Sequence, residues 1–146
     1  MVRELVDPNC TLPEVRLNID SPQDAGFFGG YICHFTVIKE PEGINVGSGF
    51  LQIDNSHKEV QFVNIGRNGQ STQKGIGLSS YIGAVEFAHN LGFDFYSCSS
   101  TLTADSARIW EILAERGAAQ VIEPLAKSPI WEDKLTGKFV VPFALS

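Results

Sequence analysis

The chain has 146 residues, of which 43% are hydrophobic and 19% charged, and its net charge is −6. This length predicts one domain, which we expect to span residues 1–146, and the apolar fraction is sufficient for a packed core. An acidic surface repels the phosphates of nucleic acids, so no nucleic-acid partner is expected.

The first half of the chain predicts an irregular lead followed by antiparallel strands. Residues 1–14 include Pro8 and Pro13 and predict the lead. Alternating apolar and polar residues then predict strands at residues 15–20, 31–38, 44–53 and 59–65. Turn-forming residues separate the later strands, at Pro41 and Gly43 and again at residues 54–57. The result is an antiparallel β-meander.

The second half changes to a helical period. We expect a helix over residues 77–91, ended by Gly92, and a short strand over residues 93–98. Thr103 predicts the N-cap of a second helix, which ends near residue 116, and residues 139–143 predict a final strand. The predicted fold class is α+β, with a single mixed sheet in which the antiparallel β-meander is followed by helix, strand, helix and strand.

A glycine-rich segment joins the fourth predicted strand to the first long helix. Its residues are Thr72, Gln73, Lys74, Gly75, Ile76 and Gly77. Glycines allow close approach of the backbone, and a helix start offers unpaired N–H groups, so this junction predicts a phosphate site. Lys74 precedes its glycines, which excludes a P-loop, and Ser80 replaces the third glycine of a dinucleotide fingerprint.

The three cysteines, Cys10, Cys33 and Cys98, are far apart in the sequence. Their odd number and wide spacing predict buried free thiols and give no reason to expect a disulfide framework or a metal site. No signal peptide opens the chain, and no apolar run is long enough to cross a membrane. We therefore expect a cytoplasmic protein that does not contact membranes.

Three segments together resemble the GNAT superfamily of acyl-CoA N-acyltransferases. The glycine-rich segment is similar to the pyrophosphate loop of that family. The segment from Ala88 through Leu91 and Gly92 to Phe93 resembles the family's helix end and following strand, and residues 107–117 resemble its next helix. The resemblance covers residues 45–120. The sequence of residues 99–117 also resembles GNAT-like domains of phage-encoded proteins.

This resemblance implies a GNAT-like fold and acetyl-CoA as cofactor. The pantetheine arm would lie along Val63 and Ile65, with a backbone N–H near Ile65 polarising the acyl carbonyl. The pyrophosphate would lie on the glycine-rich segment, at Thr72, Gln73, Lys74, Gly75, Ile76 and Gly77. The expected catalytic base is Glu59, because two-residue alternation places it on the same strand face as Val63 and Ile65.

Other positions depart from the family pattern. Thr72 and Ala104 replace common cofactor contacts, and Trp110 occupies the place of the tyrosine that often protonates the leaving thiolate. Indole is not a useful acid, so we expect Trp110 to be a packing residue. Tyr81 and Tyr96 could supply a phenol, although core packing is the simpler expectation for both.

These departures leave two functions open. The first is acetyl transfer from acetyl-CoA to an amine of a protein or a small molecule. The second is a non-catalytic GNAT-fold binding module that acts through a protein partner. The sequence does not identify the acceptor and leaves a homodimer open.

Overall fold

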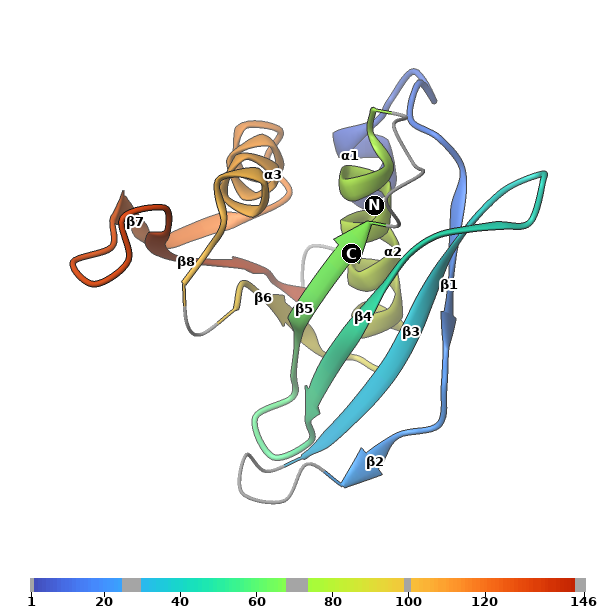
Figure 1. Cartoon of the computed structure of the whole chain (residues 1–146), viewed down its shortest axis with the longest axis horizontal. Coiled ribbons are helices and arrows are strands. Elements are labelled where there is room, and N and C mark those ends of the chain that lie inside the picture. The colour runs from blue at the N-terminus through green and yellow to red at the C-terminus, as the bar shows by residue number, and fades with distance from the viewer. Residues whose placement is uncertain (1, 25–29, 68–73, 99–100, 144–146) are drawn as a thin grey trace.

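The computed structural model describes residues 2–24, 30–67, 74–98 and 101–143, which form three helices and one eight-stranded sheet (Figure 1). The helices are α1 (Val2–Val6), α2 (Ile76–Asn90) and α3 (Ala104–Glu115). The strands are β1 (Val15–Ile19), β2 (Gln23–Asp24), β3 (Tyr31–Lys39), β4 (Ile44–Asp54), β5 (Glu59–Arg67), β6 (Asp94–Tyr96), β7 (Gln120–Lys127) and β8 (Leu135–Val141).

The strand order is β1-β3-β4-β5-β6-β8-β7, with β2 pairing β3 outside this path. Strands β1, β3, β4 and β5 pair antiparallel, β5 and β6 pair parallel, and β8 pairs antiparallel with both β6 and β7. The predicted α+β class is confirmed, as is the order of a meander followed by helix, strand, helix and strand.

Local capping residues determine where the two long helices begin and end. The Thr103 side chain accepts a hydrogen bond from the Ser106 backbone N–H at 3.1 Å, which caps the start of α3. Gly92 follows α2 with a φ of +80°, the left-handed conformation that glycine adopts without a steric penalty. Both predicted helix boundaries are therefore confirmed.

The predicted irregular lead at residues 1–14 is wrong in part, because α1 lies within it. Val2 and Val6 are buried on one side of this short helix, and Arg3 forms an ion pair with Glu86 of α2 at 2.6 Å. The four-residue spacing of the two valines places them on one helical face. Packing against α2 thus supports a helix that is too short to form alone.

Helices α2 and α3 cover the same face of the sheet. Phe62 of β5 and Phe95 of β6 lie on that face. The Phe62 ring lies 4.8 Å from Tyr81 of α2, and the Phe95 ring stacks on Trp110 of α3 at 5.6 Å. Trp110 is 1% exposed, so its predicted packing role is confirmed.

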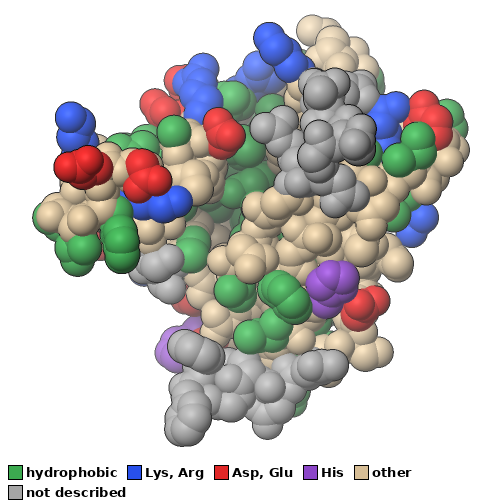
Figure 2. Space-filling model, viewed as in Figure 1, with side chains coloured by type: hydrophobic (Ala, Val, Ile, Leu, Met, Phe, Trp, Pro, Cys, Tyr) green, Lys and Arg blue, Asp and Glu red, His purple; other side chains and the backbone are tan. Residues whose placement is uncertain are grey.

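The other face of the meander carries no helix among the described residues. In Figure 1, α2 lies behind the strands of the meander, and the opposite face is turned to the viewer. Half-buried or exposed side chains such as His34, Phe50, Gln52 and Gln61 lie on it. Figure 2 shows that the middle of this face carries mainly uncharged side chains and backbone. We call it the open face.

The cysteines and the helix lengths bear on two further expectations. Cys33 is buried and Cys98 is partly buried, but Cys10 is exposed, so the prediction of buried thiols is wrong for Cys10. None of the helices in the described ranges is long and apolar enough to cross a membrane.

Candidate functional site

Strands β5 and β6 separate soon after they meet. Their last register pair is Gln61 with Tyr96. Beyond it, the Ser97 N–H donates to the Phe139 carbonyl at 3.0 Å, and the Ser97 hydroxyl accepts from the Phe139 N–H at 3.0 Å. The chain after β6 therefore follows β8, and the two strands open into a V (Figure 1).

A β-bulge lies on β5 at the mouth of this V. Phe62 pairs with Leu51 of β4, whereas Asn64 pairs with Phe50. Successive residues of β4 point to opposite faces, so Phe62 and Asn64 also do, although only Val63 lies between them. Because of the extra residue at Val63, odd-numbered side chains lie on one face of β5 before the bulge and on the other face after it.

The bulge corrects the predicted position of Glu59. Ile65 pairs with Gly49, and Glu59 pairs with Asp54, and these two partners lie on opposite faces of β4. Ile65 therefore lies on the face that the helices cover, and Glu59 lies on the open face. The expectation that Glu59 and Ile65 share a face is wrong, because simple alternation assumes a strand without a bulge. Glu59 also lies about 13 Å along the strand from Val63.

A cavity of about 160 Å³ lies in the V, and we call it the splay cavity. Its walls come from β5, the end of β6, α2, and α3 with the segment before it. The lining residues are Phe62, Val63, Asn64, Ile65, Tyr81, Tyr96, Ser97, Cys98, Thr101, Leu102, Thr103, Ser106 and Trp110. Val63 and Ile65, two of the predicted cofactor residues, are among them.

A second cavity of about 850 Å³ lies between the start of α2, the first turns of α3 and the ends of β4 and β5. We call it the large cavity. Figure 2 shows a hollow in this part of the molecule with hydrophobic side chains at its floor. Lys74, Gly75, Ile76 and Gly77 line it, and these are four of the predicted phosphate contacts. Thr72 and Gln73 lie outside the described residues.

The start of α2 faces the large cavity without a side-chain cap. Gly75 is the N-cap residue, and its carbonyl accepts the first intrahelical bond, from the Ser79 N–H at 2.9 Å. The N–H groups of Ile76, Gly77 and Leu78 precede that bond, so α2 supplies no partner for them. They add the positive end of the helix dipole to the cavity wall, which favours an anion there.

Two cations lie near this helix start. Lys74 and Arg108 are both exposed and line the large cavity, and the Arg108 guanidinium lies 3.4 Å from the Glu115 carboxylate. Arg108 was not predicted, because it lies on α3, far from Lys74 in sequence. The sequence did offer one signal, since Arg108 lies three residues after Asp105 and four before Ile112, and this spacing places all three on one face of a helix.

The glycines also have packing reasons for being glycine. Gly75 has a φ of +91°, and a Cβ there would lie 2.9 Å from Pro13 Cδ. A Cβ on Gly77 would lie 3.1 Å from Ile109 Cδ1 of α3. The glycine pattern thus reflects both the close approach of neighbouring segments and the anion site.

The two cavities share four lining residues, which are Ile65, Tyr81, Thr103 and Ser106. The Tyr81 hydroxyl lies 2.8 Å from the Ser106 hydroxyl. Burial raises the pKa of Tyr81 above 10, and the hydrogen bond to Ser106 opposes that shift. Burial also raises the pKa of Tyr96, with smaller contributions from the carboxylates of Glu59 and Asp94.

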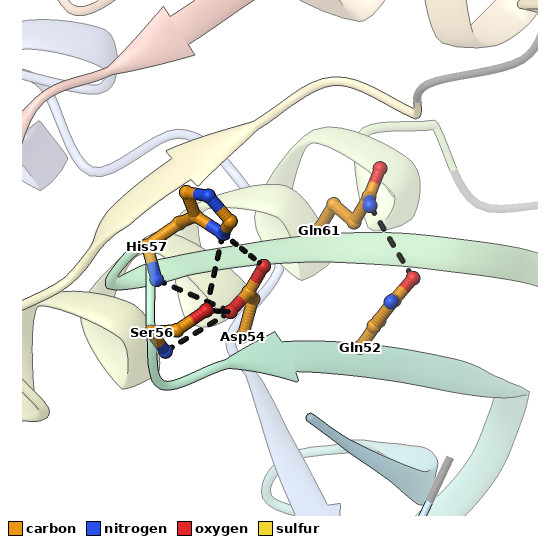
Figure 3. A network of polar contacts seen from close by, with 5 residues as sticks. All are labelled: Gln52, Asp54, Ser56, His57 and Gln61. Carbon is orange, nitrogen blue, oxygen red and sulfur yellow. Dashed lines mark hydrogen bonds and ion pairs between the residues drawn. The ribbon is translucent and has the colours of Figure 1, made fainter. Parts of the chain in front are cut away.

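The β4–β5 turn brings Ser56, His57 and Asp54 together (Figure 3). The Asp54 carboxylate accepts hydrogen bonds from Ser56 at 2.7 Å and from His57 Nδ1 at 2.7 Å, which lower its pKa from 3.8 to about 2. Ser56 also approaches His57 at Nδ1, the nitrogen that contacts Asp54. A catalytic triad needs the serine and the aspartate on different ring nitrogens, so this cluster stabilises a turn.

Carboxylates line one register row of the open face. Asp54 pairs with Glu59, and Glu59 pairs with Asp94 of β6. Within the described part of the chain, no group of three or more His, Cys, Asp or Glu side chains could hold a metal ion.

The sequence matches no protein-family model and no curated protein. Solved structures resemble the fold. The spermidine N-acetyltransferase of Vibrio cholerae in complex with CoA and spermine has a TM-score of 0.58 and 14% identity over 77% of this chain and 66% of its own. A chimera of that enzyme, SpeG, and hSSAT has a TM-score of 0.59 and 13% identity over 78% and 67%.

A dodecameric structure of the Vibrio cholerae enzyme has a TM-score of 0.55 and 14% identity over 77% of this chain and 66% of its own. The chain thus spans about two thirds of the length of these solved proteins. At such low identities the likeness establishes the fold and leaves activity and substrate to be argued. The chain has the GNAT fold of the spermidine N-acetyltransferases.

Proposed function

We propose that the protein is an N-acyltransferase that moves an acetyl group from acetyl-CoA to an amine. The observation that carries this proposal is the pair of neighbouring cavities along β5, which share four lining residues. One lies at the uncapped start of α2 and suits an anion, and the other lies where β5 leaves β6. A ligand with a charged phosphate end and a long polar arm matches this arrangement.

The residues present fit the two ends of such a ligand. The N–H groups of Ile76, Gly77 and Leu78, together with Lys74 and Arg108, would hold the pyrophosphate in the large cavity. Thr72 and Gln73 are proposed as further contacts, as their place in the loop motif implies.

The pantetheine arm would pair with the edge of β5 that β6 leaves free, at Val63 and Ile65. Acetyl-CoA supplies the activated acyl group as a thioester. A backbone N–H of β5 near Ile65 would stabilise the negative charge that develops on the acyl oxygen.

The acceptor is proposed to be a cationic amine that approaches from the open face. The splay cavity reaches that face, where its lining residues are Val63, Asn64 and Tyr96. Further along the same face lies the carboxylate row of Asp54, Glu59 and Asp94. The net charge of −6 also favours a cationic substrate. The similar Vibrio cholerae enzyme was solved with spermine, which supports a polyamine as the first acceptor to test.

Two roles are open to Glu59. Its distance of about 13 Å along the strand from Val63 is too long for direct proton abstraction, which needs about 3 Å. We therefore favour attraction of the cationic acceptor, and the originally predicted role as base remains testable. The dodecameric neighbour supports a homo-oligomer as the first assembly to examine.

Calorimetric titration with CoA and acetyl-CoA tests the proposal. We expect saturable binding, and a ligand at about 100 times its dissociation constant should add about 2.7 kcal/mol of stability in a thermal-shift assay. Release of free CoA thiol in the presence of spermine or a lysine peptide tests the transfer. Binding without transfer to any amine would favour the non-catalytic binding module, and absence of CoA binding would reject the transferase.

A further inference from the structure

Tyr81 and Ser106, whose hydroxyls lie 2.8 Å apart, line both cavities. Among the described residues that line both cavities, Tyr81 is the only tyrosine. Tyr96 lines only the splay cavity, and the Lys138 Nζ lies over its ring, 5.4 Å from the centroid. If the phosphates lie in the large cavity and the thioester in the V, the cofactor passes the Tyr81 hydroxyl on its way.

Neighbouring aromatic rings hold the Tyr81 side chain in place. The ring is 4% exposed and makes edge contacts with Phe62 at 4.8 Å, Trp110 at 5.8 Å and Phe95 at 6.3 Å. Such contacts fix the plane of the ring and therefore the position of its oxygen. Within the described ranges, this oxygen has one hydrogen-bond partner, the Ser106 hydroxyl.

Ser106 is itself positioned by the start of α3. Its backbone N–H donates to the Thr103 side chain at 3.1 Å, which places Ser106 in the first turn of the helix. The positive end of the α3 dipole therefore lies beside the Tyr81 oxygen. A negative charge that forms on this oxygen would be stabilised by the dipole and by a hydrogen bond from Ser106.

We propose that Tyr81 is a catalytic residue of the proposed transfer, and that its hydroxyl donates a proton to the departing CoA sulfur while Ser106 stabilises the resulting phenolate. The inference rests on the proposed function. The cationic amine first loses a proton to water, its neutral nitrogen forms the new bond to the acyl carbon, and the carbon–sulfur bond breaks. The sulfur takes the proton of Tyr81, the acylated nitrogen releases a second proton to water, and water returns a proton to the phenolate.

The surroundings fit this role. Burial raises the pKa of Tyr81, so the phenol carries its proton at neutral pH. Trp110, the other polar aromatic residue beside it, has an N–H that is no useful acid. The titratable groups that line the splay cavity beside Tyr81 are Tyr96, on β6, and Cys98, just beyond it, and those that line the large cavity are Lys74, Asp105 and Arg108. Cys98 alone of these contributes to the pKa shift of Tyr81.

Three variants test the proposal: Tyr81→Phe, Ser106→Ala and the control Tyr31→Phe. Tyr81→Phe removes one hydroxyl and keeps the ring. It should lower kcat by about 10²–10⁴-fold, the usual effect of losing a positioned acid or base, with the CoA dissociation constant changed less than about threefold. Tyr31→Phe removes the hydroxyl of an exposed tyrosine of β3 that lines neither cavity, and it should keep kcat within about threefold.

The pH dependence of kcat separates an acid from a packing group. The wild-type rate should fall at high pH as Tyr81 loses its proton, and Tyr81→Phe should remove this alkaline limb. Ser106→Ala should move the limb to higher pH, because the phenolate loses a hydrogen bond. A Tyr81→Phe enzyme with wild-type kcat, or an unchanged alkaline limb in both variants, would overturn the inference while the transferase stands. A wild-type protein that binds CoA but transfers nothing would overturn the proposed function and, with it, this inference.

Discussion

Glu59 and Ile65 belong to the same strand but lie on opposite faces of the sheet, because the bulge at Val63 lies between them. The bulge thereby divides β5 into two parts. The Ile65 side chain faces the helices and the cavities, and the Glu59 side chain lies on the open face beside the carboxylates of Asp54 and Asp94. This division separates the proposed cofactor from the groups that would attract an amine.

Replacing Glu59 tests what that position does. Glu59→Gln removes one charge from the carboxylate row, so we expect the KM for a cationic amine to rise about threefold to tenfold, while kcat and CoA affinity stay within about threefold. Steady-state kinetics at low and high salt would measure this, since salt should reduce the difference. Glu123→Gln, on exposed β7, is the matched control. Loss of the rising limb of the pH–rate profile, with a rate loss of about 10²–10⁴-fold, would instead establish Glu59 as the base.

Local sequence signals predicted most of the fold. Thr103 and Gly92 marked helix boundaries, and alternation located the meander strands, because capping and half-burial depend on neighbouring residues. Strand β7 was missed because Pro124 interrupts its pattern and its side chains are largely exposed on both faces, as an edge strand permits.

The candidate site was harder to predict, because tertiary structure assembles it. One inserted residue at Val63 reverses a face without changing the composition of the strand. Arg108 joins Lys74 only after α3 packs beside the start of α2. The cytoplasmic location and the resemblance to phage-encoded proteins remain predictions.

The cations of the large cavity should contribute to CoA binding. Lys74→Ala and Arg108→Ala should each raise the dissociation constant about threefold to tenfold, as exposed charge contacts usually do, and the effect should shrink with added salt. Lys127→Ala, on exposed β7, controls for net charge. These variants are cleaner than a Gly75 substitution, because a side chain at that position would strain a φ of +91° and meet Pro13. Calorimetry that finds all three variants equal to wild type would place the phosphates elsewhere.

Trp110 should be a major contributor to stability. Its ring stacks on Phe95 at 5.6 Å and on Phe139 at 5.7 Å, so Trp110→Ala would leave a large cavity in the core and cost about 3–5 kcal/mol. Trp131 provides the control, because it is 58% exposed and its replacement by Ala should change the unfolding free energy by less than about 0.5 kcal/mol. Urea unfolding curves would compare the two. Similar midpoints for both variants would contradict the packing role.

The Asp54–His57 ion pair should give the stability a defined pH window. The pKa of Asp54 falls from 3.8 to about 2, so its contribution is present above about pH 3.8 and is lost as the pH falls toward 2. The hydrogen bond to Asp54 raises the pKa of His57 above 6.5, so that contribution is present below 6.5 and is lost as the pH rises through the raised value. The difference in melting temperature between wild type and His57→Ala should therefore be largest between about pH 4 and 6.5 and shrink on both sides. Because the ion pair is exposed, we expect added salt to reduce this difference in melting temperature. A difference that does not vary with pH would show that His57 supports the turn through its backbone alone.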